Sequence, residues 1–321
     1  MSRFVVPLLA LGAAVAVASA QPDKLAPKAP FPALPDDEAW GKLPPQKKPA
    51  LPEWARTLAG PMPKTTAKML ELDYLHRAKN PLGAALAARI RWTVADALDS
   101  KYGRDAAQAD LRRAEPVPGP KTDDEQVILA FARKLTLAGH AITDDEFAHL
   151  LKRTSPEQVT AIVHTVAYAN FHNRIVLALG VKGEVPIAEP IGVAFDLDAA
   201  KVKAPDRLPW DDLKTAKGDG LAVRVEWSKA EFDQLNATLD KQKERRLRMP
   251  LPDAAVIEKL PPRERDSAKK ILWNTVSAGY QPELTRAWFA VLYAFYEEAK
   301  VDRVFTNSMF WVVTRTNDCF Y

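Results

Sequence analysis

Residues 155–180 read SPEQVTAIVHTVAYANFHNRIVLALG and predict one long helix. Pro156 suits the first helical position, where its missing N–H would have no partner in any case. Gly180 is the type of residue that commonly follows a helix end. Between them, apolar residues recur at three- and four-residue spacing, which gives a helix one core-facing side. The residues on that side are Val159, Ile162, Val163 and Val166.

The same helical spacing continues outward from this stretch, and we interpret residues 51–181 as a first helical unit. Capping boxes mark further helix starts, with Thr-Asp-Asp-Glu at 122–125 and again at 143–146. In each box the hydroxyl and the carboxylate satisfy backbone N–H groups that the helix leaves free. A third box, Ser-Lys-Ala-Glu at 228–231, opens a second helical unit, residues 228–321. The predicted fold class is all-α.

The segment between the two units, residues 182–227, changes character. Its prolines at 186, 190, 205 and 209 interrupt any long helix. Residues 185–197 and 221–227 are consistent either with short strands or with surface loops. We expect an irregular, proline-rich connector here.

The N-terminal residues 1–20 have the pattern of a secretory signal peptide. Arg3 precedes an apolar run, and Ala-Ser-Ala at 18–20 is a typical cleavage site. The run is shorter than the roughly 20 residues of a bilayer span, although an uncleaved anchor is an alternative. Residues 21–50, rich in Pro, Lys and Ala, predict a flexible lead. We expect an exported protein, periplasmic or extracellular, with no membrane span once the signal is removed.

The composition excludes several function classes. Among 321 residues, 45 are basic and 41 acidic, and a net charge of +4 is too small to indicate a nucleic-acid partner. Cys319 is the only cysteine, so the sequence predicts no internal disulfide framework. None of the glycine-rich nucleotide loops, the Gly-x-Ser-x-Gly sequence or the His-Glu-x-x-His sequence occurs. We therefore predict no cofactor.

Three side chains at four-residue spacing, His164, Tyr168 and His172, share one side of the helix in 155–180. A metal site would need them to converge with a further ligand such as a carboxylate. We interpret them as a polar helix face and predict no metal site. His76 and His149 lie in other amphipathic segments without ligand spacing.

A short internal similarity links the two units. Residues 90–94, Ile-Arg-Trp-Thr-Val, align with residues 309–313, Met-Phe-Trp-Val-Val. In the same register Asp99 meets Asp318, Ser100 meets Cys319 and Tyr102 meets Tyr321. Two copies of one helical unit fit this pattern, and two unrelated amphipathic helices are the alternative. The two aligned tryptophans, Trp92 and Trp311, are predicted core residues.

The order of elements is distinctive over residues 51–181 and 262–321. The stretches that carry it are 81–83, 91–95, 100–103, 110–113, 131–136, 142–147, 155–159 and 169–181 in the first unit and 307–321 in the second. This order resembles the carboxymuconolactone decarboxylase family, which includes the alkylhydroperoxidase D-like proteins. The resemblance implies an all-α alkylhydroperoxidase D-like bundle that assembles into homo-oligomers.

The resemblance also implies a chemistry. Thiol peroxidases of that family use a Cys-x-x-Cys pair at a helix start, with a nearby histidine and an acidic residue about three turns earlier. In this chain only Cys319 matches that site, and Asn307 stands where the acidic residue would be. The first copy has Ser100 and Gly103 in place of the cysteine pair, which makes it a degenerate counterpart. The decarboxylase members act on a lactone ring, and none of their acid–base residues is matched.

Two functions stay open at this point. The apolar run that leads to Cys319 has no stop signal, so we expect the motif to be cut at Tyr321. One further cysteine would complete a redox pair, whereas Cys-x-x-Cys-His would suggest haem attachment. The first hypothesis is an exported peroxidase that reduces a small peroxide and draws electrons from an envelope thiol reductant. The second is a non-catalytic binding or assembly module on the same fold.

Overall fold

A computed structural model shows an all-helical protein in the part of the chain that it describes. The described residues are 31–43, 49–117, 119, 121–181, 183–184, 187–192, 195, 247–270 and 272–316. The helices before residue 182 are α1 (Asp36–Lys42), α2 (Glu53–Ala59), α3 (Pro63–Ala78), α4 (Ala84–Ala97), α5 (Lys101–Ala114), α6 (Asp123–Ala138), the 3-10 turn η2 (Gly139–Ala141), α7 (Asp144–Leu151) and α8 (Pro156–Ala178). Those after residue 246 are α10 (Ala254–Glu258), α11 (Pro262–Lys270), α12 (Leu272–Tyr280), α13 (Pro282–Ala299) and α14 (Arg303–Thr316).

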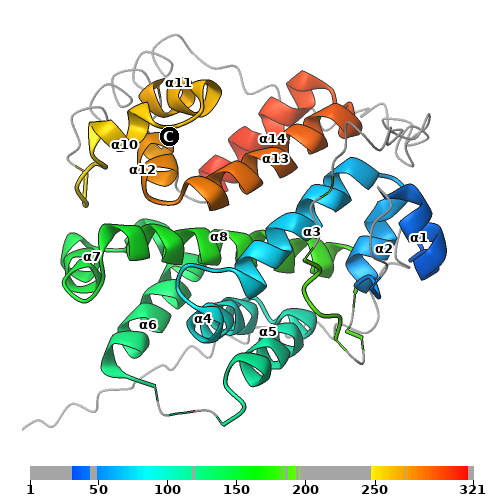
Figure 1. Cartoon of the computed structure of the whole chain (residues 1–321), viewed down its shortest axis with the longest axis horizontal. Coiled ribbons are helices and arrows are strands. Elements are labelled where there is room, and N and C mark those ends of the chain that lie inside the picture. Colours follow the sequence, from blue (N-terminus) through cyan, green and yellow to red (C-terminus); the bar gives the residue numbers. More distant parts are fainter. Residues whose placement is uncertain are drawn as a thin grey trace, which may run out of the picture.

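The long helix α8 crosses the middle of the molecule (Figure 1). Helices α4, α5 and α6 lie on one side of it, and the group α10–α14 lies on the other. Contacts join α8 to α4, α5 and α6 and also to α12, while α3 packs along α13. The two halves of the sequence therefore meet at α8 and at the α3–α13 pair.

Helix α8 forms largely as predicted. Ser155 caps it, Pro156 occupies its first turn, and the backbone turns away at Gly180 with φ of +70°. This positive φ suits a residue that lacks a Cβ. Three of the four predicted core residues are buried, but Val163 is 38% exposed. It faces a groove described below.

Side-chain caps explain two neighbouring helix starts. Thr122 and Thr143 each form the complete predicted capping box, with Glu125 and Glu146 respectively. Three acidic residues also lie in the first turn of each helix, where their negative charges interact favourably with the positive end of the helix dipole. The third predicted box, at 228–231, lies outside the described residues.

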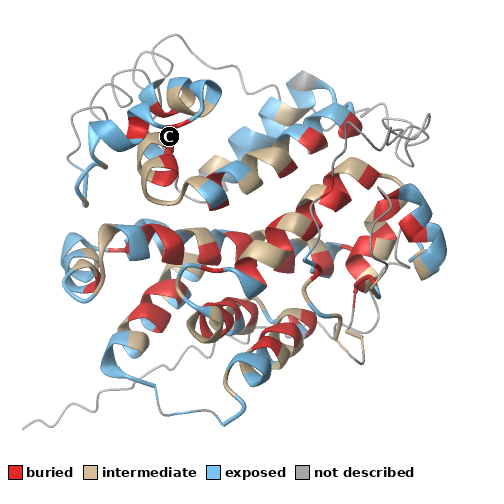
Figure 2. Ribbon diagram, in the orientation of Figure 1, coloured by how far each residue is buried: buried red, intermediate tan, exposed pale blue. Residues whose placement is uncertain are grey.

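Two buried clusters form the main core, and α8 contributes to both (Figure 2). One lies among α1–α3, α5 and the C-terminal half of α8, with Trp54 and Leu72 fully buried. The other lies among α4, α6, α7 and the N-terminal half of α8, with Ile90 and Ile162 fully buried. Because α8 belongs to both clusters, its side chains can connect sites on either side of it.

Helices α3 and α13 are joined by a buried carboxylate. Glu298 of α13 is fully buried, and it accepts hydrogen bonds from the backbone N–H groups of Lys64 (2.6 Å) and Thr65 (2.8 Å). It also accepts one from the Thr65 hydroxyl at 2.7 Å. These N–H groups belong to the first turn of α3, where a helix has no backbone acceptors of its own. Glu298 thus caps a helix that lies more than 230 residues earlier in the chain.

Two sequence predictions about packing are wrong. Within the lead of residues 21–50, residues 36–42 form α1, whose Trp40 is buried and donates from Nε1 to the Pro49 carbonyl at 2.9 Å. Ala39, Trp40 and Leu43 supply the apolar contacts that the composition of this segment concealed. Trp92 and Trp311 are not core residues, since they are 41% and 47% exposed.

The predicted connector, residues 182–227, lies only partly within the described residues. Of residues 185–197, those that the structure describes form no strand, and residues 221–227 lie outside the described part. Among the described helices, none has the length and apolarity that crossing a membrane would require. Residues 1–20 also lie outside the described part.

Candidate functional site

A network of buried charges lies between α3, α4 and α5. Arg77 donates from Nε and Nη2 to the two carboxylate oxygens of Asp110, at 2.8 and 3.1 Å, and from Nη1 to Asp73 at 3.1 Å. Arg91 donates to Asp110 at 2.6 Å. All four side chains are buried, so each ion depends on its partners for the interactions that water would otherwise supply.

The two arginines determine the charge state of Asp110. Burial alone raises the pKa of this carboxyl, but the charges and hydrogen bonds of Arg91 and Arg77 outweigh it and lower the pKa to about 2. Burial also lowers the pKa of Arg77, yet Asp73 and Asp110 outweigh it and hold that pKa well above its ordinary value. At neutral pH Asp110 is therefore a carboxylate and Arg77 a guanidinium cation.

Helix α8 adds aromatic groups to this network. The Tyr168 hydroxyl donates to Asp73, and the Tyr168 ring stacks on His76 with centroids 4.3 Å apart. His172, one turn further along, lies edge-on to Trp54 at 5.2 Å. Burial lowers the pKa of His172 to about 4, so its imidazole is neutral at pH 7. Of His164, Tyr168 and His172, which the sequence led us to interpret as a polar helix face, the last two are buried.

Ser100 and Gly103, which are predicted to stand in place of a cysteine pair, lie at the start of α5. Ser100 is fully buried and acts as the N-cap of α5, where its hydroxyl accepts from the Gly103 N–H at 3.2 Å. Gly103 packs against Asn173, and a Cβ at residue 103 would lie 1.8 Å from the Asn173 Oδ1. Both residues therefore serve the packing of α5 against α8. The remaining predicted site residue, Cys319, lies outside the described residues.

A cavity of about 20 Å³ separates the charge network from Gly103. It is lined by Asp73, Arg77, Arg91, Tyr102, Gly103, Ala106, Tyr168, Ala169, His172 and Asn173. Only a molecule the size of water fits such a space.

A much larger groove, of about 630 Å³, lies between α8, α12 and α13. Its lining residues are Phe147, Val159, Thr160, Val163, His164, Ala167, Leu247, Arg248, Met249, Leu272, Trp273, Val276, Ser277 and Trp288. Among the described residues that line the groove, Arg248 is the only one with a permanent charge. It forms an ion pair with Asp144 at 2.7 Å. The groove is therefore apolar, with a few polar groups.

Those polar groups form a chain whose hydrogen atoms can be assigned. Thr285 donates its hydroxyl to the Gln281 carbonyl at 2.7 Å, so its oxygen accepts from Ser277, also at 2.7 Å. Since Ser277 has used its only hydrogen, the contact of 2.7 Å with His164 Nε2 requires that the imidazole donates. Nδ1 is then the acceptor nitrogen of His164. This direction does not activate Ser277 as a nucleophile, because His164 gives it a proton instead of taking one.

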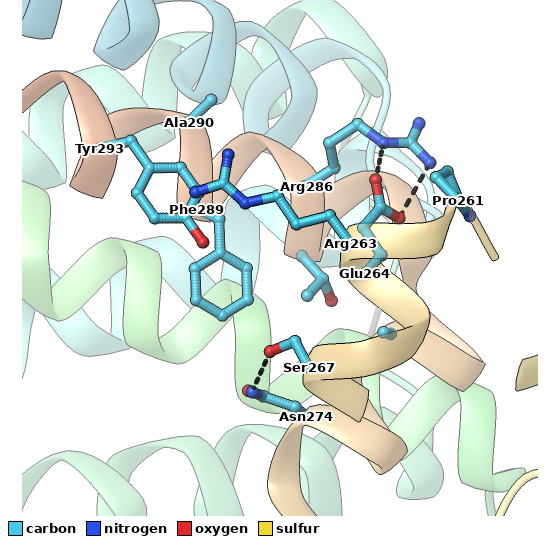
Figure 3. A pocket seen from close by; sticks show the side chains of 11 residues that line it. Pro261, Arg263, Glu264, Ser267, Asn274, Arg286, Phe289, Ala290 and Tyr293 are labelled. Atoms are coloured by element: carbon cyan, nitrogen blue, oxygen red, sulfur yellow. Dashed lines mark hydrogen bonds and ion pairs between the residues drawn. The ribbon is translucent and has the colours of Figure 1, made fainter. Parts of the chain in front are cut away.

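Figure 3 shows a further pocket, of about 230 Å³, between α11, α12 and α13. Its two arginines are both engaged: Arg286 pairs with Glu264 at 2.7 Å, and Arg263 lies 4.3 Å over the ring centre of Tyr293. Asn274 donates to Ser267 at 2.8 Å. We regard this pocket as part of the packing of α11 on α13.

No metal site is built into the described part of the chain, where His, Cys, Asp and Glu side chains do not gather in groups of three or more suited to an ion. Asn307, which replaces the acidic residue of the resembled family, lies on an exposed position of α14.

The chain matches no protein family model, and no curated protein and no solved structure matches it. The likeness to the carboxymuconolactone decarboxylase family therefore rests on the residues quoted above.

Sequence reasoning missed the charge network. Two signals were present: Asp73 and Arg77 are spaced four apart, as in a helical ion pair, and Arg91 directly follows the core residue Ile90. Charged side chains at core-facing positions are almost always paired when buried. Their partner Asp110 could not be identified, because it lies 33 residues from Arg77.

Proposed function

We propose that this protein is a helical binding module, made of two related units, that takes up an uncharged apolar molecule in the groove between α8 and α12. The observation that carries the proposal is the groove itself. It is large enough for a small-molecule ligand, mostly apolar, and polar at a few fixed points, which are the properties of ligand sites in general.

The two-unit arrangement is supported by helix boundaries. The interval of 219 residues between Ile90 and Met309 also separates the first residues of α2 and α12, of α3 and α13, and of α4 and α14. The same interval relates Trp54, Ala59, Gly60 and Pro63 to Trp273, Ala278, Gly279 and Pro282. Unrelated helices would not share a single register over this length.

Backbone geometry supports the same register. The N-cap residues of α3 and α13, Met62 and Gln281, have φ, ψ of −141°, 63° and −136°, 64°. Four residues later Thr66 and Thr285 each donate to the carbonyl of that N-cap, both at 2.7 Å. Both helices also begin with proline.

The repeat suggests why the groove exists. Trp54 of α2 is fully buried against the C-terminal part of α8, where the first core cluster encloses it. Its counterpart Trp273 of α12 is 45% exposed and lines the groove opposite His164. In the proposed repeat, Trp54 thus completes the core of the first unit, whereas its counterpart Trp273 lines an open groove in the second unit.

The groove favours an uncharged ligand. Arg248 already pairs with Asp144, and burial lowers the pKa of His164 to about 4, so its ring is neutral at pH 7. The Nε2–H of His164 is committed to Ser277, which leaves Nδ1 as an acceptor. A ligand with an apolar body and one hydroxyl or N–H donor matches these groups.

Fluorescence titration with Nile red, an uncharged apolar dye, tests the binding function. We expect saturable binding that Val163→Glu abolishes, since a carboxylate would then stand in the groove. Leu177→Glu is the matched control, because Leu177 is also exposed on α8 but does not line the groove. Equal binding by both variants would overturn the proposal. Displacement by 1-octanol but not by octanoate would support the preference for uncharged ligands.

A second candidate function is thiol redox chemistry at Cys319. The register that pairs α4 with α14 pairs Cys319 with Ser100, and Ser100 is the N-cap of α5. Cysteines at helix N-termini have lowered pKa values and form reactive thiolates. If this function holds, Cys319→Ser removes peroxide-dependent thiol turnover while thermal unfolding stays unchanged; equal turnover in the variant would exclude it. Export and homo-oligomer assembly belong to the same family-based proposal.

A further inference from the structure

Three buried polar atoms beside Gly103 have no hydrogen-bond partner: Nε of Arg91, Nε2 of His172 and Oδ1 of Asn173. The three residues come from α4 and α8, and all of them line the cavity of about 20 Å³. An unpaired polar atom in the interior is unfavourable, so native proteins contain only a few of them. Three around one cavity indicate a ligand that pairs with them.

The hydrogen-bonding types of these atoms limit the ligand. Arg91 Nε–H can only donate, and Asn173 Oδ1 can only accept. The amide of Asn173 is oriented by its other end, because Nδ2 donates to the Ala169 carbonyl at 2.7 Å. The ligand must therefore both accept and donate hydrogen bonds.

The positive and negative charges around the cavity balance, so the site has no preference for binding an ion. Arg77 and Arg91 are balanced by Asp73 and Asp110, which bond to them directly. Nearer the surface, Arg113 pairs with Asp110, while the Tyr102 hydroxyl donates to Glu184 at 3.1 Å. No excess positive charge remains among these groups to attract a small anion such as chloride.

We propose that this cavity is a binding site for a single water molecule that accepts from Arg91 Nε–H, donates to Asn173 Oδ1 and bonds with His172 Nε2. The volume fits one water, and three partners are the usual number for a buried water. The site joins the charge network of α3, α4 and α5 to α8, at the place where Gly103 of α5 packs against Asn173. This water site is independent of the proposed ligand groove and of the proposed redox chemistry at Cys319.

Crystallography of the full chain tests the site directly. We expect one solvent peak in the cavity, within hydrogen-bonding distance of all three atoms. A second crystal soaked in sodium bromide, with data collected at the bromine edge, distinguishes water from a halide. An anomalous peak in the cavity would overturn the proposal, and so would the absence of any peak.

Thermal unfolding of two serine variants gives a second test. Ala106 lines the cavity, whereas Ala107 is fully buried on the same helix and does not line it. In Ala106→Ser the new hydroxyl can take the place of the water, so we expect a smaller drop in Tm than in Ala107→Ser. An equal or larger drop in Ala106→Ser would contradict the site.

Discussion

Asn173 occupies the space that a side chain at Gly103 would need. A Cβ at Gly103 would lie 1.8 Å from Asn173 Oδ1 and 2.8 Å from the Cβ of Ala95. No non-bonded atoms approach so closely, so α5 and α8 can pack as they do only with glycine at this position. The packing of α5 on α8 is thus built around this missing side chain.

Gly103→Cys tests this relationship. We expect a loss of stability of about 1–3 kcal/mol or more, because overpacking forces neighbouring atoms to move. Chemical denaturation measures the loss. Asn173→Ala in the same chain should recover part of it, which a double-mutant cycle detects. Ser100→Cys is the control, since it changes one atom, and a larger loss there than at Gly103 would contradict the argument.

Glu298→Ala should destabilise the α3–α13 pair by about 2–4 kcal/mol. It leaves the part-buried N–H group of Lys64 and the buried N–H group of Thr65 without an acceptor, and such groups are costly. Glu297→Ala is the matched control, because Glu297 is exposed and pairs only with the Lys64 side chain. Exposed ion pairs contribute little, so its effect on urea unfolding should stay below about 1 kcal/mol. Equal effects of the two variants would argue against the buried cap.

Stability should fall as the pH is lowered from about 6.5 towards 4. His172 has a pKa of about 4 in the folded protein, mainly because it is buried, and near 6.5 when unfolded. Its contribution is therefore complete above pH 6.5 and is lost as the pH falls through 4, which amounts to on the order of 3 kcal/mol. His172→Phe keeps the aromatic packing without titrating. Its denaturation free energy should vary less over this pH range, and an identical pH profile would contradict the assignment.

The loss of stability when a tryptophan is replaced by alanine should depend on how deeply its side chain is buried. Trp54→Ala removes a fully buried side chain and should cost about 3–5 kcal/mol. Trp92→Ala removes a side chain that is 41% exposed and should cost clearly less. Thermal unfolding of both variants checks the order. A larger loss for Trp92 would restore its predicted place in the core.

Local signals in the sequence predicted the helices of the first unit well. The capping residues Thr122, Thr143 and Ser155 and the stop at Gly180 depend only on near neighbours, and all are confirmed. Helix α1 could not be predicted in this way, because it is stabilised by the burial of Trp40 against residues that are distant in the sequence. The similarity around Trp92 and Trp311 predicts a repeat, and the same interval of 219 residues also relates Trp54 to Trp273.

The sequence by itself determined the all-helical class, because apolar spacing, caps and helix stops act within one or two turns. Only the tertiary structure decided which polar residues are buried together. Asp110 meets Arg77 and Arg91, His164 meets Ser277, and Glu298 meets Thr65, across separations of 19 to 233 residues. The reason is physical: a buried charge or hydroxyl is tolerated only beside its partner, and which partner lies beside it depends on how the helices pack.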